Sequence, residues 1–148
     1  MSGMLRAVAE VLLPRAEEKA QKFVLEIDAS TGSVIGDARR LRESVEHILR
    51  NAVAYTEEDG QITLTASGTH EEVTVIVADN GPGIEPGDQA QVFARFHRSG
   101  STGRGDAALG LGLPLTRQFI EAHGGKVELQ SEPGKGTSVT MTIPRAPQ

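Results

Sequence analysis

The sequence predicts a single soluble domain of the α+β class. Its 148 residues are enough for one substantial core, whereas two domains would be crowded. Apolar residues recur at helical spacing in three segments, and in several shorter segments they alternate in the manner of strands. A hydrophobic content of 38% with 24% charged residues is typical of a globular protein. We therefore expect helices and strands to share one core.

Two helices are predicted in the first part of the chain. The first should be kinked or divided at Pro14. The second should be capped by Asp37 and carries the apolar stripe Leu41, Val45, Ile48, Leu49 and Ala52. The elements expected here are a helix over residues 4–22, a short strand over 23–27, a brief strand over 34–36 and a helix over 38–55.

Four strands and one helix are predicted in the remainder. A polar turn joins the first two strands, and Gly124 and Gly125 should end the helix. The elements expected here are strands over residues 61–67 and 72–78, a helix opening at 109–115 and continuing through Ala122, and strands over 126–130 and 137–143.

The predicted strand over residues 73–78 leads directly into an acid and a glycine turn. Both faces of this strand are largely apolar, which is typical of an interior strand covered on both sides. Asp79 follows it, and a buried carboxylate is costly unless something hydrogen-bonds to it. Gly81 and Gly83 would let a ligand approach the backbone. The alternative is a hairpin turn, but the polar residues that follow provide no return strand, so we interpret Asp79 as an acid that faces a ligand.

Two further positions are candidates for binding a ligand. Asn51 falls at the edge of the apolar stripe of its helix, where an amide could meet a ligand; the alternative is a boundary residue bonded to water or backbone. Gly110 and Gly112 precede a helix whose free N–H groups and dipole favour phosphate, unless these glycines serve only close packing. Residues 99–107 are rich in glycine and are expected to be mobile, with a plain linker as the alternative.

Composition excludes several classes of function. A net charge of −5 and only 3% aromatic residues argue against nucleic-acid binding. There are no cysteines, so disulfides and thiolate metal sites are excluded. No apolar run approaches the ~20 residues of a membrane span, and no signal peptide is present, so we expect a cytoplasmic domain.

The order of the motifs resembles that of one family. An asparagine on a helix is followed by DNGPGI, VFARF, a glycine-rich stretch, GLGL opening a helix, and EPGKGT before a strand. From about Phe23 to Pro144 the chain resembles the ATP-binding domain of sensor histidine kinases, which is related to type II topoisomerases, heat-shock chaperones and mismatch-repair ATPases. The resemblance implies the Bergerat fold, a two-layer α/β sandwich with a mixed sheet and about three helices on one face. We expect this domain to span residues 4–145, with 1–3 a cloning remnant of an excised domain and 146–148 a tail.

The resemblance implies ATP and Mg²⁺ as cofactors and assigns a role to each motif. Asn51 matches the asparagine that ligates Mg²⁺, and Asp79 matches the acid that accepts the adenine amino group. Thr137 matches the residue behind that acid, joined to it through water. The other implied nucleotide-binding residues are Tyr55 beside adenine; Gly81, Gly83 and Ile84 along the purine slot; Phe93 and Phe96 at the base of a lid; and Gly110, Leu111, Gly112 and Leu113 at the phosphates. Arg95, Arg98 and Arg104 add positive charge around the lid, although each alone could be a solvated surface residue.

The sequence departs from the family pattern at three places. Ala54 replaces a frequent basic residue, His47 stands where kinases commonly have asparagine, and Ala108 and Leu109 replace the usual Gly-Thr before the glycine box. Hydrolysing relatives place a glutamate at the position of His47, and Glu43 and Glu46 should point elsewhere. Autonomous ATP hydrolysis is therefore not expected.

The resemblance implies transfer of the γ-phosphoryl group of Mg-ATP to a histidine elsewhere. None of the four histidines lies in a dimerisation-type helix, so the acceptor is expected on a separate helical dimerisation domain, with a response regulator as an indirect partner. The isolated domain should be a monomer and its parent a homodimer, either free or membrane-anchored. One alternative is a degenerate kinase domain that binds nucleotide weakly, or binds a protein partner, and acts as a signalling module. The other is a stand-alone ATPase.

Overall fold

The computed structural model describes residues 2–28, 31–32, 38–56, 59–81, 116–132 and 134–144. These ranges contain two labelled helices and five strands, and residues 116–122 are also helical. The labelled elements are α1 (Ser2–Glu18), β1 (Lys22–Ile27), α2 (Ala38–Tyr55), β2 (Gln61–Gly68), β3 (Glu72–Asp79), β4 (Lys126–Glu132) and β5 (Gly136–Pro144).

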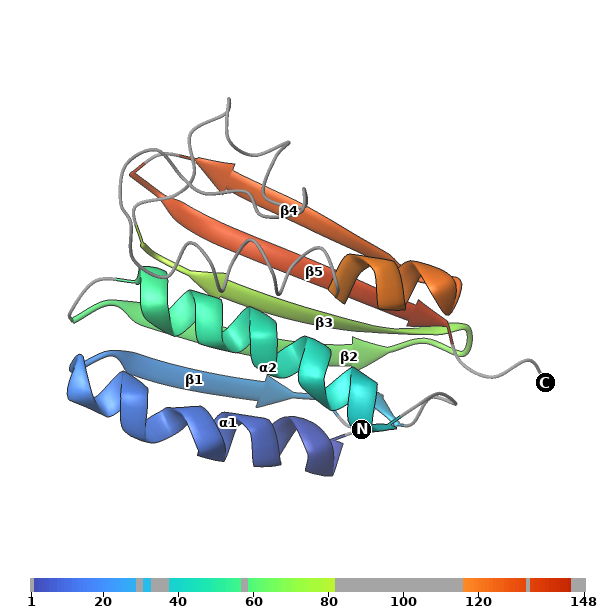
Figure 1. The fold of residues 1–148 in the computed structure, drawn as a ribbon, viewed down its shortest axis with the longest axis horizontal. Helices are drawn as coiled ribbons and strands as arrows, with labels where there is room; N and C mark the ends of the chain where they lie inside the picture. Colours follow the sequence, from blue (N-terminus) through green and yellow to red (C-terminus); the bar gives the residue numbers. More distant parts are fainter. Residues whose placement is uncertain are drawn as a thin grey trace.

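The strands form one mixed sheet in the order β1-β2-β3-β5-β4. β1 pairs with β2 in parallel, and every other neighbouring pair is antiparallel. The two helices and the helical residues 116–122 lie on the same side of the sheet (Figure 1). The predicted two-layer α+β architecture, with a mixed sheet and helices on one face, is confirmed.

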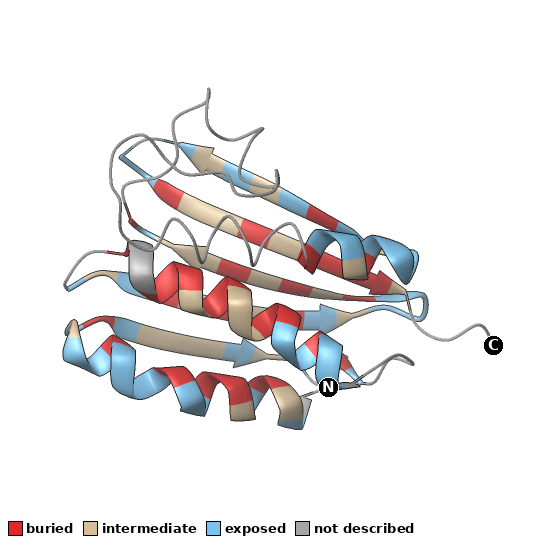
Figure 2. Ribbon diagram, viewed as in Figure 1, coloured by how far each residue is buried: buried red, intermediate tan, exposed pale blue. Residues whose placement is uncertain are grey.

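The core lies between these two layers. Alternate residues of each central strand face the helices, and the inner stripes of the helices are buried against them (Figure 2). Burying a single Leu or Ile side chain stabilises the fold by about 1.5–3 kcal/mol relative to exposing it. The largest fully buried aliphatic side chains include Leu5, Leu12, Ile48, Leu49, Ile62, Leu64, Ile120, Met141 and Ile143.

The other face of the sheet is not covered by any described element. The prediction that β3 is covered on both sides is therefore wrong. Val73, Val75 and Val77 are buried, but Ile76 on the opposite face is only half-buried. Its neighbours in register are Thr65 on β2 and Thr140 on β5, so the apolar pattern of β3 does not extend across the sheet. A short apolar run on one strand cannot reveal the polarity of its neighbours.

The helix boundaries differ in detail from the predictions. α1 ends at Glu18 rather than residue 22, and Ala20 follows in a left-handed conformation (φ 54°) that a helix cannot continue. Pro14 lies inside α1 without dividing it. Proline has no N–H to donate to the carbonyl of Glu10, but both Pro14 and Glu10 are exposed to solvent. α2 matches its predicted range.

The remaining boundaries are close to the predicted ones. Gly124 adopts φ 80°, and the N–H groups of Gly124 and Gly125 donate to the carbonyls of Glu121 and Ile120, so the helix ends there as predicted. The brief strand over 34–36, the cap at Asp37 and the start of the helix at 109–115 lie outside the described residues.

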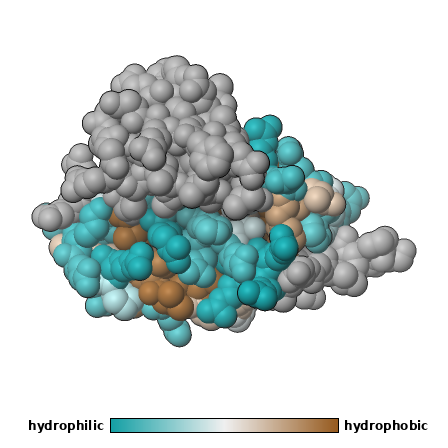
Figure 3. Space-filling view, in the orientation of Figure 1, coloured by the Kyte–Doolittle hydropathy of each residue, from teal (hydrophilic) through white to brown (hydrophobic). Residues whose placement is uncertain are grey.

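Where Figure 3 shows described residues on the helical face, most are hydrophilic, with a smaller hydrophobic area among them. Among the described residues, the large apolar side chains classed as exposed are Val11 and Leu13, both on α1. None of the described helices has the length and apolar character required to cross a bilayer.

Candidate functional site

Asp79 is the last residue of β3 and lies on the helix-facing side of the sheet. Its Oδ1 accepts a hydrogen bond of 2.8 Å from the N–H of Gly81, and the N–H of Thr137 also donates to this carboxylate. Burial raises the pKa of Asp79 above its ordinary value, and these two backbone hydrogen bonds lower it by less. The carboxylate is thus held in place at the end of the strand, at a cost in desolvation.

The start of β5 lies so close to the backbone of Asp79 that position 136 has no room for a side chain. Gly136, the first residue of β5, has φ 111°, and a Cβ atom there would lie 2.0 Å from the carbonyl oxygen of Asp79. Thr137 stands opposite Asp79 in the β3–β5 register. Its Oγ1 lies 2.8 Å from Oγ of Ser131, which also donates to the Gly136 carbonyl at 3.1 Å. These contacts brace the start of β5 against the acid.

A shallow hollow of about 300 Å³ lies beside Asp79. It is lined by residues of the β3 end and the β4–β5 turn, namely Ala78, Asp79, Gln130, Ser131, Glu132, Lys135, Gly136, Thr137 and Ser138.

Asn80 was not singled out from the sequence, yet it fixes the turn after Asp79. Its Oδ1 accepts from the N–H of Gln61 at 2.7 Å, and its own N–H donates to the Gln61 carbonyl at 3.2 Å. Asn80 therefore ties the chain beyond Asp79 to the start of β2. An asparagine directly after a strand was the available signal, because Asn side chains commonly replace backbone partners in turns.

Asn51 lies on the inner face of α2 and is only 6% exposed. It is more deeply buried than the predicted edge of the stripe would allow. Its Nδ2 has no hydrogen-bond partner in the described part of the chain, which is unusual for a buried amide. The C-terminal ends of α2 and β3 and the start of β5 lie at the same edge of the domain (Figure 1). The fold thus brings Asn51, Asp79 and Thr137 to one edge.

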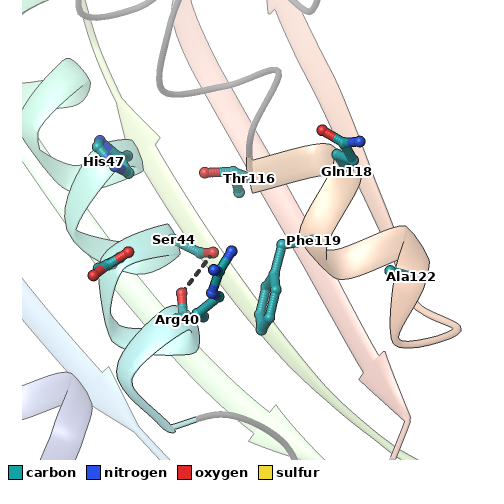
Figure 4. A pocket seen from close by; sticks show the side chains of 8 residues that line it. Arg40, Ser44, His47, Thr116, Gln118, Phe119 and Ala122 are labelled. Carbon is teal, nitrogen blue, oxygen red and sulfur yellow. Dashed lines mark hydrogen bonds between the residues drawn. The ribbon is translucent and has the colours of Figure 1, made fainter.

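A second hollow of about 300 Å³ separates α2 from the helical residues 116–122 (Figure 4). Thr116 is 2% exposed, its Oγ1 has no partner among the described residues, and it points across the groove toward α2. His47 and Ser44 lie on the facing wall. The full lining is Arg40, Glu43, Ser44, His47, Thr116, Gln118, Phe119 and Ala122.

The two acids near His47 were predicted to point away from the site. Glu46 forms an ion pair of 2.5 Å with Arg50, so its carboxylate has a partner on its own helix. Glu43 pairs with Arg39 at 3.4 Å, but it also lines the groove two turns before Asn51. The helical phase read from the sequence therefore predicted the direction of the Glu46 side chain better than that of Glu43.

Several predicted site residues lie outside the described part of the chain. For Tyr55, only the backbone at the end of α2 is described. The structure therefore does not test the roles predicted for Gly83, Ile84, Phe93, Arg95, Phe96, Arg98, Arg104, Gly110, Leu111, Gly112 and Leu113.

Residues 36–147 match the family model described as "Histidine kinase-, DNA gyrase B-, and HSP90-like ATPase". The chain belongs to this ATPase family. Membership makes this an ATP-binding domain, and its fold is that of the catalytic domain of histidine kinases.

Curated relatives of this ATPase-family domain are longer sensor proteins. The chain is 36% identical over 145 residues to Sensor protein DivL of Caulobacter vibrioides, covering 93% of this chain and 18% of DivL. It is 35% identical over 145 residues to the adaptive-response sensory kinase SasA of Synechococcus sp. (strain JA-2-3B'a(2-13)), covering 97% of this chain and 38% of SasA. The chain thus spans less than half the length of these relatives.

Solved structures of this ATPase family superimpose over nearly the whole domain. The nucleotide-free catalytic domain of histidine kinase ThkA gives a TM-score of 0.85 at 26% identity, covering 99% of this chain and 95% of that one. The mycobacterial sensor histidine kinase MprB gives 0.85 at 26% identity, covering 100% and 97%. Full-length ShkA in complex with AMPPNP gives 0.83 at 33% identity, covering 99% and 30%.

Proposed function

We propose that this domain holds Mg-ATP and presents its γ-phosphoryl group to a histidine on a separate helical domain of a longer parent protein. The observation that carries the proposal is the half-buried Asp79 carboxylate, held by two backbone N–H groups where Gly136 leaves no room for a side chain. An ionised carboxylate offers only acceptors and so suits the exocyclic amine of adenine. Hydrogen bonds from that amine would offset part of the cost of burial.

The metal would be held mainly by the nucleotide itself. Among the described residues, no group of three or more His, Cys, Asp or Glu side chains could form a protein cage for it. Mg²⁺ commonly takes one or two protein ligands and fills its remaining positions with phosphate oxygens and water. The buried amide of Asn51, with Nδ2 unpartnered in the described region, can rotate to present its oxygen. Asn51 is accordingly the proposed single protein ligand.

Catalysis in this proposal rests on position and charge. A nitrogen of the acceptor imidazole attacks the γ-phosphorus, the bond from that phosphorus to the bridging oxygen breaks, and ADP leaves with the electron pair. The crystal structure of full-length ShkA, which is similar to this chain, is a complex with the ATP analogue AMPPNP, and this supports nucleotide binding. The acceptor domain would dimerise the parent, and a response regulator would receive the phosphoryl group.

Nucleotide titration with and without Mg²⁺ tests the site. We expect Asp79→Asn to weaken binding under both conditions, because the acceptor for the adenine amine is replaced by an amide. Asn51→Ala should keep the metal-free affinity and lose the gain that Mg²⁺ provides. Asp59→Asn is the matched control, since Asp59 is exposed in a turn at φ 64°, a conformation that Asn tolerates. Unchanged binding by Asp79→Asn would refute the assigned adenine contact.

Phosphotransfer distinguishes a kinase domain from a degenerate one. The isolated domain with Mg-ATP should label none of its own histidines, and adding the helical domain of the parent should produce phosphohistidine there. His70 is the residue to monitor by mass spectrometry, because Glu71 follows it, although it lies in the exposed turn between β2 and β3 rather than in a helix. Weak ATP binding without transfer would instead support the degenerate signalling module, for which Ala54 and the altered lid entry at Ala108 and Leu109 are the motivating departures. Magnesium-dependent ATP turnover by the isolated domain would support a stand-alone ATPase.

A further inference from the structure

Side chains from outside α2 hydrogen-bond to carbonyls at its C-terminal end. The last four carbonyls of a helix have no partner within it, and a cation near them is favoured by the helix dipole. α2 has no basic residue in its last turn. Donors for its final carbonyls can come from water or from residues elsewhere in the chain.

Two side chains from the connection between α1 and β1 supply these donors. The Nζ of Lys19 donates to the Val53 carbonyl at 2.9 Å. The Nε2 of Gln21 donates to the carbonyl of Val53 at 3.1 Å and to that of Thr56 at 2.7 Å. The Lys19 carbonyl also accepts from the N–H of Asp59 at 3.1 Å. The α1–β1 connection thus clamps the end of α2 and the loop beyond it.

Gln21 occupies this position at an energetic cost. It is 6% exposed, and its Oε1 is buried without a partner among the described residues. A buried acceptor that forms no hydrogen bond destabilises the folded state, and an apolar side chain of similar volume would avoid that cost. The two hydrogen bonds donated by Nε2 offset part of this cost; one ends on Val53 in the last turn of α2 and the other on Thr56, the residue that follows the helix.

We infer that Gln21 is a positioning residue for Asn51, an inference that rests on the proposed function. Asn51 lies two residues before Val53, and helical geometry pairs its carbonyl with the amide of residue 55, inside the clamped turn. The N–H of Thr56 closes the same turn by donating to the Ala52 carbonyl at 2.9 Å. If this turn frays, the backbone that aims the Asn51 amide is no longer held. Gln21 thereby acts on metal-dependent binding without touching the nucleotide.

Nucleotide affinity measured with Mg²⁺ and with EDTA tests this inference. Gln21→Met keeps the volume and removes the donors, and we expect it to reduce the affinity gain from Mg²⁺ about fivefold, the scale of one net hydrogen bond. Its affinity in EDTA should stay within about twofold of the wild-type value, because the adenine contact at Asp79 is untouched. Gln21→Lys, which again provides donors, should restore the gain.

A second readout needs no ligand. In Gln21→Met the amide of Thr56 should exchange with solvent faster than in the wild type, because the last turn of α2 opens more often. The matched control is Val8→Ala, which removes buried volume from α1 (Val8 is 1% exposed) but no donor to α2. It should lower the Tm while leaving both the gain from Mg²⁺ and the exchange of Thr56 unchanged. All titrations are run well below the Tm of every variant.

The outcomes separate this inference from the function on which it rests. A wild-type domain whose affinity does not respond to Mg²⁺ overturns the proposed function. A normal wild-type response that Gln21→Met retains in full overturns the positioning role alone. If Gln21→Met lost the same nucleotide affinity with Mg²⁺ and with EDTA, and Val8→Ala shared this loss, Gln21 would have a merely structural role. That result would also overturn the positioning role. If Gln21→Met does not fold, Lys19→Met removes the other donor to Val53 and must diminish the gain in the same direction.

Discussion

Substituting Gly136 by alanine should be among the most damaging small changes in this domain. The residue has φ 111°, which L side chains rarely adopt, and strain of this kind costs about 1–3 kcal/mol. The new Cβ would also lie 2.0 Å from the Asp79 carbonyl oxygen and 2.9 Å from Cα of Asn80, both backbone atoms, where ordinary contact begins at 3.4 Å. The start of β5 must therefore move away from the end of β3.

That movement breaks the pairing of Asp79 with Thr137, including the hydrogen bond from the Thr137 N–H to the carboxylate. Losing one or two net hydrogen bonds adds about 1–2 kcal/mol to that strain, so the total loss of stability is about 2–5 kcal/mol. For a domain whose stability is of the order of 5–15 kcal/mol, this is a large fraction. Denaturant titration measures it directly as a lower midpoint, with an unchanged slope if unfolding stays two-state.

Gly134 in the same turn provides the matched control. It has φ 82°, but a Cβ there would meet no atom within 4 Å. Gly134→Ala should therefore cost only the conformational strain, about 1–2 kcal/mol. If both variants lost the same stability, the close approach of β5 to Asp79 would be refuted.

Two further predictions concern buried polar groups. Asp79→Asn should raise the free energy of unfolding of the ligand-free domain at pH 7, since it removes a carboxylate whose pKa is raised mainly by burial. The ionised form is penalised only in the folded state, so the penalty is absent below the ordinary pKa of 3.8 and grows as the pH rises through the folded-state pKa. In denaturant titrations from about pH 3 to pH 7, the free energies of unfolding of the wild type and Asp79→Asn should converge at the acid end. A difference that stays constant with pH would contradict this reasoning. Thr116→Val removes a buried hydroxyl without a partner in the described structure and keeps its shape, so stability should stay the same or rise by up to about 1 kcal/mol; a clear loss in thermal denaturation would reveal a hidden partner for that hydroxyl.

The local spacing of apolar residues was sufficient to predict much of the fold. The apolar stripe of α2 predicted its range, and alternation predicted β2, β3, β4 and β5 to within two residues. Asp79 was identified as a candidate site residue because burying an acid directly after an apolar strand is costly unless something hydrogen-bonds to it. The end of α1 was missed because it depends on the left-handed Ala20, which no periodicity signals.

By itself, then, the sequence determined the type of each element and the order of the motifs, since both depend on spacings of a few residues. Only the tertiary structure decided the order of the strands, the single covered face of the sheet and the neighbours of Asp79. It alone placed Gln21 against the end of α2 and Gly136 against the backbone of Asp79. Such contacts join residues far apart in the chain, and they form because the buried faces of all the elements must pack at once.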